Sequence, residues 1–305
     1  MKLTKQQIAY LYASASILAW SSISTAFKLS LSQLSSFGLL FIASFSAVLF
    51  LGVANLLRNA NAQYSLKTFI KNVRLSMLPG MLNPFVYYLI LFEAYNRLRA
   101  QEAQALNYTW AIVLALFSIW LLKEKFRVLD LLALLISFLG VVIISARGNL
   151  TALHFDDAIG SFMAVFTSLI WAFYWIINLK DKRPALVKLF FNFLIGFLLI
   201  AAYVLIGRAK VFLPGANLLY GLIGGIYVGI FEMGLTFLLW FKALEYTDNT
   251  AKISNLIFLT PFISLLFIAQ ILGESIHPAT FVGLCLIVLS NLIQKGLFHF
   301  SKRNT

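Results

Sequence analysis

The stretch from Leu218 to Ala243, LLYGLIGGIYVGIFEMGLTFLLWFKA, is long enough to cross a bilayer and carries an acid, Glu232, near its midpoint. A hydrocarbon core of about 30 Å takes roughly 20 apolar residues at about 1.5 Å per residue. An ionised acid at that depth costs at least ~2.5 kcal/mol, so it faces a cavity or a partner and not lipid. The stretch therefore predicts a membrane helix built around a carboxyl group.

The rest of the chain has the same character, because 61% of its 305 residues are hydrophobic and 11% are charged. In an average soluble domain about a quarter of the residues are charged. Hydropathy predicts ten membrane spans and leaves no segment for a separate catalytic or nucleotide-binding domain. The predicted spans are Ile8 to Lys28, Leu34 to Leu57, Val73 to Tyr95, Gln101 to Leu122, Val128 to Ala146, Ala158 to Leu179, Leu186 to Ile206, Leu218 to Phe241, Ala251 to Leu272 and Pro278 to Leu297.

The basic residues are distributed as a topology signal. With the N-terminus placed in the cytoplasm, eighteen of the 24 Lys and Arg residues fall on the cytoplasmic side. Positive residues favour cytoplasmic loops, so both chain termini are predicted to be cytoplasmic, in agreement with an even number of spans. The net charge of +13 is spread over several separate loops. It therefore does not indicate a nucleic-acid partner.

The chain repeats itself at an offset of about 150 residues. Trp20 matches Trp171, Asn83 matches Glu232, and the run from Leu122 to Glu124 resembles the run from Leu272 to Glu274. Each copy holds five helices, and because five is odd the second copy must be inverted relative to the first. We predict an all-α integral membrane protein, ten helices in a 5+5 inverted repeat, with repeats at residues 8–146 and 158–297. In carriers of this kind the substrate lies near the midplane, where the repeats meet.

The chain resembles the EamA-type members of the drug/metabolite transporter superfamily. The resemblance covers nearly the full length and rests on Trp20 and Trp171, AQEAQALNYTW at 100–110, FEMGLTFLLW at 231–240, and Thr260-Pro261. The NYTW run at 107–110 is most similar to the branch that includes bacterial aromatic amino acid exporters. A proline usually follows that tryptophan, whereas this chain has Ala111. The resemblance implies a ten-helix carrier of the bacterial inner membrane that works in the direction of export.

Polar and aromatic residues recur on single faces of several predicted spans, at intervals of three and four residues. Such stripes predict a shared central cavity lined by amides, hydroxyls and aromatic rings. This surface suits a zwitterion with an apolar or aromatic side group. The predicted substrate-binding residues are Trp20, Ser24, Asn83, Tyr87, Gln104, Asn107, Tyr108, Trp110, Trp171, Tyr174, Trp175 and Glu232.

Several of these features have purely structural alternatives. Glu232 is either a counter-charge for a substrate ammonium group, with possible proton exchange, or a neutral acid bonded to Asn83 or a backbone carbonyl that holds two helices together. Membrane serines such as Ser24 commonly bond their own backbone, and Trp175 fits an interfacial aromatic belt. The glycines at 221, 225 and 229 indicate close helix packing. Glu274 precedes the last span, where a carboxylate complements a helix N-terminus.

Other classes of function lack their characteristic residues. The three histidines lie in loops or at the tail and Cys285 is the single cysteine, so no metal site, cofactor or membrane-embedded enzyme is predicted. The chain lacks the GxxxxGK[ST] run of an ATP-driven pump. It also lacks a basic residue at mid-depth, which a phosphorylated substrate would need. We expect a facilitator or an ion-coupled secondary carrier that exports amino acids or related small amines by alternating access. A carrier of other cationic metabolites or drugs, and a nontransporting membrane sensor or partner-binding protein, are the alternatives.

Overall fold

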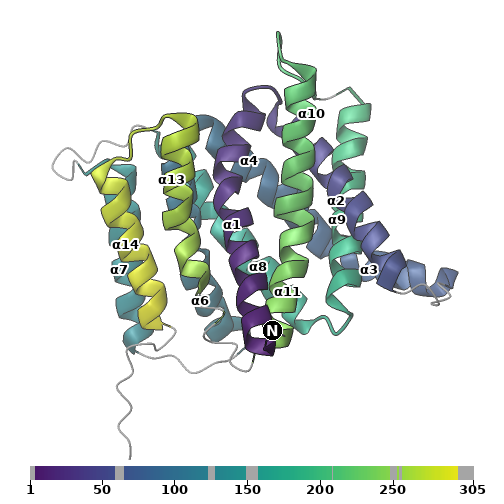
Figure 1. The fold of residues 1–305 in the computed structure, drawn as a ribbon, viewed down its shortest axis with the longest axis horizontal. Coiled ribbons are helices and arrows are strands. Elements are labelled where there is room, and N and C mark those ends of the chain that lie inside the picture. The colour runs from purple at the N-terminus through teal and green to yellow at the C-terminus, as the bar shows by residue number, and fades with distance from the viewer. Residues whose placement is uncertain are drawn as a thin grey trace, which may run out of the picture.

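A computed structural model describes residues 4–58, 65–122, 128–148, 157–207, 209–247, 253 and 256–294. Helices make up its regular structure, and an isolated bridge between Leu34 and Phe212 is the one β-type pairing among the described residues. The predicted all-α class is therefore confirmed for the part of the chain that the structure describes. Figure 1 shows α1 beginning and α14 ending at the lower side of the molecule.

The elements follow one another as long helices, several of which are interrupted. They are α1 (Lys5–Leu31), α2 (Ser36–Arg58), α3 (Leu66–Gly80), the π-helical η1 (Met81–Val86), α4 (Tyr87–Arg97), α5 (Ala100–Asn107), α6 (Trp110–Leu122), α7 (Val128–Ser145), α8 (Ala158–Lys180), α9 (Ala185–Leu205), α10 (Leu218–Tyr227), the π-helical η2 (Val228–Leu235), α11 (Thr236–Tyr246), the 3₁₀ turn η3 (Ile257–Leu259), α13 (Thr260–Leu272) and α14 (Pro278–Gln294).

Helix is present in every predicted span, although several boundaries differ. The third predicted span begins seven residues earlier, at Leu66, because Ser65 caps the helix by accepting a hydrogen bond from the Thr68 N–H. The fourth is broken between Asn107 and Trp110 into α5 and α6. Five described helices are long and apolar enough to cross a membrane, and three shorter ones are also apolar. The long ones are Ser36–Arg58, Leu66–Arg97, Ala158–Asn178, Ala185–Leu205 and Leu218–Tyr246.

Helix contacts follow the same pattern in both halves of the chain. α1 packs against α11 and α13, and α8, in the second half, packs against α4 and α6. The remaining large contacts join one helix from each half, namely α2 with α9 and α7 with α14. Exchange of the two halves therefore leaves the list of principal helix contacts unchanged.

Glycines of α10 and of the start of η2 allow a close approach to α2, in agreement with the predicted close helix packing. A side chain at Gly225 would collide with Ile42, and one at Gly229 would collide with the Ala43 carbonyl and Ser46. Small residues at such spacing let helix backbones come together and gain dispersion contacts. This packing fixes which face of the following η2 segment turns away from α2.

Glu274 differs from its prediction in the helix that it serves. Its carboxylate accepts hydrogen bonds from the backbone N–H groups of Ala100 at 3.0 Å and Gln101 at 3.5 Å, at the start of α5. It therefore complements the N-terminus of α5, not that of α14 as its sequence position suggested. The matching Glu124 lies outside the described residues.

Candidate functional site

Glu232 lies in η2, near the middle of the long segment formed by α10, η2 and α11. Its Oε1 accepts a 2.9 Å hydrogen bond from the hydroxyl of Tyr88, a fully buried residue of α4. The structural alternative in which Glu232 bonds to Asn83 is wrong, since its hydrogen-bond partner is Tyr88. No ion pair between described residues includes Glu232. The carboxyl group thus has a neutral donor and no cation.

The π-helical form of η2 positions this acid. The Thr236 hydroxyl donates to the Phe231 carbonyl five residues earlier, inside the widened turn. π-Helical turns are frequent at functional sites, because the extra residue re-aims the side chains around it. A second π-helical segment, η1, occurs at the matching place in the first half and contains Asn83. Asn83 has an extended backbone there, with φ −143° and ψ 117°.

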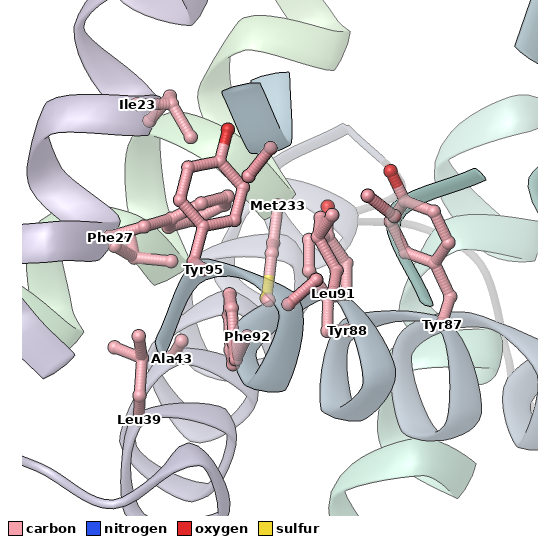
Figure 2. Packing of buried hydrophobic residues seen from close by; sticks show 14 of the residues in the cluster. Ile23, Phe27, Leu39, Ala43, Tyr87, Tyr88, Leu91, Phe92, Tyr95 and Met233 are labelled. Carbon is pink, nitrogen blue, oxygen red and sulfur yellow. The ribbon is translucent and has the colours of Figure 1, made fainter. Parts of the chain in front are cut away.

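Three tyrosines project from α4, and one of them binds the acid. Figure 2 shows Tyr87, Tyr88 and Tyr95 rising from α4 with their hydroxyl groups on the same side. Besides Tyr88, which binds Glu232, Tyr95 shares a 2.8 Å hydrogen bond with Ser24 of α1. The ring centroids of Tyr87 and Tyr88 lie 4.8 Å apart. The acid therefore binds one member of a row of phenol groups contributed by the first half of the chain.

An amide and hydroxyl network continues from this row toward α8. The Tyr87 hydroxyl donates to Asn107 Oδ1 at 3.3 Å, and Asn107 Nδ2 donates to the Thr167 hydroxyl at 2.8 Å. The Tyr87 ring also lies against Trp171, with centroids 4.8 Å apart. These contacts bring the predicted residues of α4, α5 and α8 together.

An aromatic cluster lies next to the acid along α11. Phe237 contacts Trp20 of α1 at a centroid distance of 5.6 Å and Trp171 of α8 at 6.4 Å. Trp240 also contacts Trp20, at 5.6 Å. Phe237 and Trp240 follow Glu232 by five and eight residues, which is about 8 to 12 Å along a helix. The two tryptophans matched between the repeats are thus joined through one phenylalanine.

The predicted substrate-binding residues divide by accessibility into buried ones, which can support the site, and partly accessible ones, which can line it. Ser24, Asn83, Tyr87, Gln104 and Tyr174 are buried. The partly accessible ones are Trp20, Asn107, Tyr108, Trp110, Trp171, Trp175 and Glu232. Although deep in the molecule, Glu232 is not fully covered. Because the residue is only partly covered, a ligand or water can approach it.

Three predicted residues carry buried polar atoms without a hydrogen-bond partner among the described residues. They are Oδ1 of Asn83, Oε1 of Gln104 and Nε1 of Trp175. Buried polar groups are normally paired, so unpaired ones near a candidate site are groups that a bound molecule can satisfy. Tyr174 instead receives a 3.3 Å hydrogen bond from Asn192, and Trp110 makes none of the contacts described above. Among the described residues, no side-chain hydrogen bond or ring contact joins Gln104 or Trp110 to another predicted residue.

Sequence reasoning missed Tyr88, Tyr95, Thr167, Phe237 and Trp240. A signal for one of them was present, because Tyr88 and Phe237 occupy matching positions in the two repeats at the same offset as Asn83 and Glu232. The searched part of the chain holds no group of three His, Cys, Asp or Glu side chains that could bind a metal ion. The arrangement can therefore offer one carboxyl group, several neutral hydrogen-bonding groups and aromatic faces.

Comparison with known proteins adds a family and relatives. The model of the EamA-like transporter family matches residues 7–146 and again 158–293. A protein of Clostridium kluyveri named an uncharacterized transporter is 24% identical over 199 residues, which are 64% of this chain and 63% of that protein. The chain thus matches less than two thirds of the length of that relative.

Two other relatives and a solved structure extend the comparison. A Bacillus subtilis protein, uncharacterized transporter YxxF, is 24% identical over 76% of this chain and 72% of its own. An uncharacterized transporter of Acidianus ambivalens is 27% identical over 77% of this chain and 90% of its own. One crystal structure superposes with a TM-score of 0.62 at 20% identity, covering 95% of this chain and 98% of the other. At this level of identity the likeness shows a shared fold alone.

Proposed function

Because the chain belongs to the EamA-like transporter family, we propose that it is a secondary transporter or facilitator of a cell membrane, with amino acids or related small amines as its exported substrates. Its relatives are named as transporters, which points to a carrier and not an enzyme. In a bacterium the membrane would be the inner one. A coupling proton exchanged at Glu232 is part of the proposal.

The observation that carries the substrate class is the environment of Glu232. The acid has a tyrosine donor, uncovered surface, and no basic partner among the described residues. A carboxylate in such a place is most stable when a cation joins it, since opposite charges attract strongly away from bulk water. A substrate ammonium group supplies that cation. The unpaired amide oxygens of Asn83 and Gln104 can accept hydrogen bonds from further N–H or O–H groups of the substrate.

Alternating access follows from the arrangement of the two halves. The helix contacts that remain the same when the halves are exchanged support two inverted five-helix repeats, with ten spans and both termini in the cytoplasm. The cluster of Trp20, Trp171, Phe237 and Trp240 then lies between Glu232 and the cytoplasmic end of α11. Relative movement of α1 and α8 would open or close this cluster and so control access to the acid.

The test is a thermal-shift screen of the purified carrier against amino acids, polyamines, cationic drugs, sugar phosphates and nucleotide sugars. A ligand at 100 times its Kd adds about 2.7 kcal/mol of stability. We expect amino acids or amines to raise Tm. Loss of a charge-assisted hydrogen bond in Glu232→Gln costs about 2 kcal/mol, which weakens binding roughly thirtyfold. The matched control is Glu93→Gln, because Glu93 is a half-buried acid of α4 that pairs with Arg97 and does not contact Glu232.

The screen separates the alternatives. A shift with cationic drugs alone would assign the chain to drug export, and a shift with sugar phosphates alone would refute the amine proposal. An amine shift that is equally large in the wild type and in Glu232→Gln would show that the acid is not the counter-charge. If no compound binds and reconstituted vesicles transport none of them, a sensor or partner-binding role replaces the carrier.

A further inference from the structure

The first half of α3 stands apart from the rest of the molecule. Every residue from Ser65 to Lys71 is exposed, and Asn72 is the first buried one. In Figure 1, α3 lies at the right edge of the molecule beyond α9 and runs across the view, whereas α1 and α10 run up and down. A helix that extends outward in this way needs a partner for its exposed side.

One side of α3 is basic and carries no acid. Lys67, Lys71 and Arg74 recur at intervals of four and three residues, which places them on a single face, here named the α3 basic stripe. No ion pair between described residues includes any of the three. The stripe therefore presents three positive charges that no acid among the described residues compensates.

The opposite side of α3 attaches it to the body. Arg183, in the turn between α8 and α9, donates to the Asn72 carbonyl and the Ser76 hydroxyl, each at 3.0 Å. Phe69 contacts Phe191 of α9 with ring centroids 5.5 Å apart. At 100° per residue, Asn72 and Ser76 face away from the stripe. These contacts hold the helix in one rotation, with its charges turned outward.

The length of the segment places the stripe at a membrane surface. α3, η1 and α4 form a run of 32 residues, Leu66–Arg97, which is about 48 Å at 1.5 Å per residue. This contour length exceeds the hydrocarbon core of about 30 Å, and the exposed first half of α3 is the part that can lie in the headgroup region. Exposed apolar side chains beside the stripe, Leu66, Ile70 and Met77, can enter the acyl boundary.

We propose that the α3 basic stripe is a binding site for anionic phospholipids, with Lys67, Lys71 and Arg74 contacting headgroup phosphates while Leu66, Ile70 and Met77 insert below them. Anionic lipids attract clusters of basic residues next to a membrane helix. α3 continues through η1 into α4, which carries Tyr88, the hydrogen-bond partner of Glu232. Lipid bound to the stripe therefore contacts the same helical run as that tyrosine.

The experiment places the full chain in nanodiscs of phosphatidylcholine with and without phosphatidylglycerol and measures Tm. We expect phosphatidylglycerol to raise Tm, and Lys67→Gln with Lys71→Gln to remove at least half of that rise. The matched double variant Arg99→Gln with Lys210→Gln removes two exposed bases away from α3 and its contact with Arg183, and should keep the full rise. An equal rise in both double variants, or no rise in the wild type, would overturn the proposal.

Two further experiments test the lipid site. The first does not depend on thermal unfolding, and the second distinguishes lipid phosphate from free phosphate. Ile70→Trp should show more quenching by brominated phospholipids than the wild type, whose six tryptophans set the baseline, and quenching equal to that of the wild type would place α3 away from the bilayer. Inorganic phosphate added to phosphatidylcholine nanodiscs should leave Tm unchanged. A rise with phosphate alone would assign the stripe to a soluble anion and refute a lipid site.

Discussion

The hydroxyl of Tyr88 donates to Oε1 of Glu232 across 2.9 Å and so joins α4, in the first match of the family model, to η2, in the second. This hydrogen bond connects the two halves of the chain at the candidate site. A substrate ammonium group that binds Glu232 can keep the tyrosine as a second partner, because a carboxylate accepts several hydrogen bonds. The bond is therefore both a structural link and a means of orienting the acid.

Tyr88→Phe should destabilise the protein by about 1 to 2 kcal/mol, since a buried hydrogen bond to a carboxyl group is lost. It should weaken amine binding less than Glu232→Gln does, because the carboxylate remains. Thermal unfolding and ligand-induced Tm shifts measure the two effects. Tyr87→Phe is the control, as it loses a 3.3 Å bond to Asn107 and leaves Glu232 untouched. Weaker amine binding in Tyr88→Phe than in Glu232→Gln would show that the tyrosine, and not the acid, binds the substrate.

Phe237→Ala should cost about 3 kcal/mol or more of unfolding free energy, because a buried aromatic side chain is removed and a cavity remains between Trp20 and Trp171. Denaturant or thermal unfolding measures the loss. Phe162→Ala serves as the control, since Phe162 stacks on Phe166 but is 66% exposed. Similar losses in the two variants would mean that the aromatic cluster is not tightly packed.

Gly229→Ala should destabilise by about 1 to 3 kcal/mol through overpacking, because the new methyl group collides with the backbone of α2 at Ala43. The loss should appear as a lower Tm in detergent and in nanodiscs alike. Ile226→Ala, at an exposed position of the same segment, should change Tm much less. An unchanged Tm in Gly229→Ala would place α10 and η2 further from α2 than the structure has them.

Asp181, in the turn after α8, contributes to the free energy of unfolding in a way that depends on pH. Burial acts to raise the pKa of Asp181, but hydrogen bonds and charge from Arg183 outweigh it and hold the pKa below its ordinary value of 3.8. With the folded pKa lowered, the contribution is complete above pH 3.8 and is lost as the pH falls through the folded value. Tm measured between pH 6 and pH 3 should therefore fall less steeply in Asp181→Asn than in the wild type. Parallel curves would contradict this role.

Local sequence features account for much of the fold. Apolar runs of about 20 residues predicted where helices form, since a chain in lipid must satisfy its backbone hydrogen bonds internally. Matches at an offset of about 150 residues predicted which segments correspond, and the glycine spacing predicted the close packing of α10 on α2. The ten membrane crossings and the cytoplasmic termini stay predictions.

The sequence by itself determined that helices would form and that a carboxyl group, Glu232, would lie inside one of them, because both follow from side chains close together in the chain. The tertiary structure decided the partners. It paired Glu232 with Tyr88 instead of Asn83, and it brought Glu274 to the start of α5 instead of α14. Those contacts join residues 144 and 174 positions apart, and their distances depend on helix rotation and packing, which no local pattern of residues specifies.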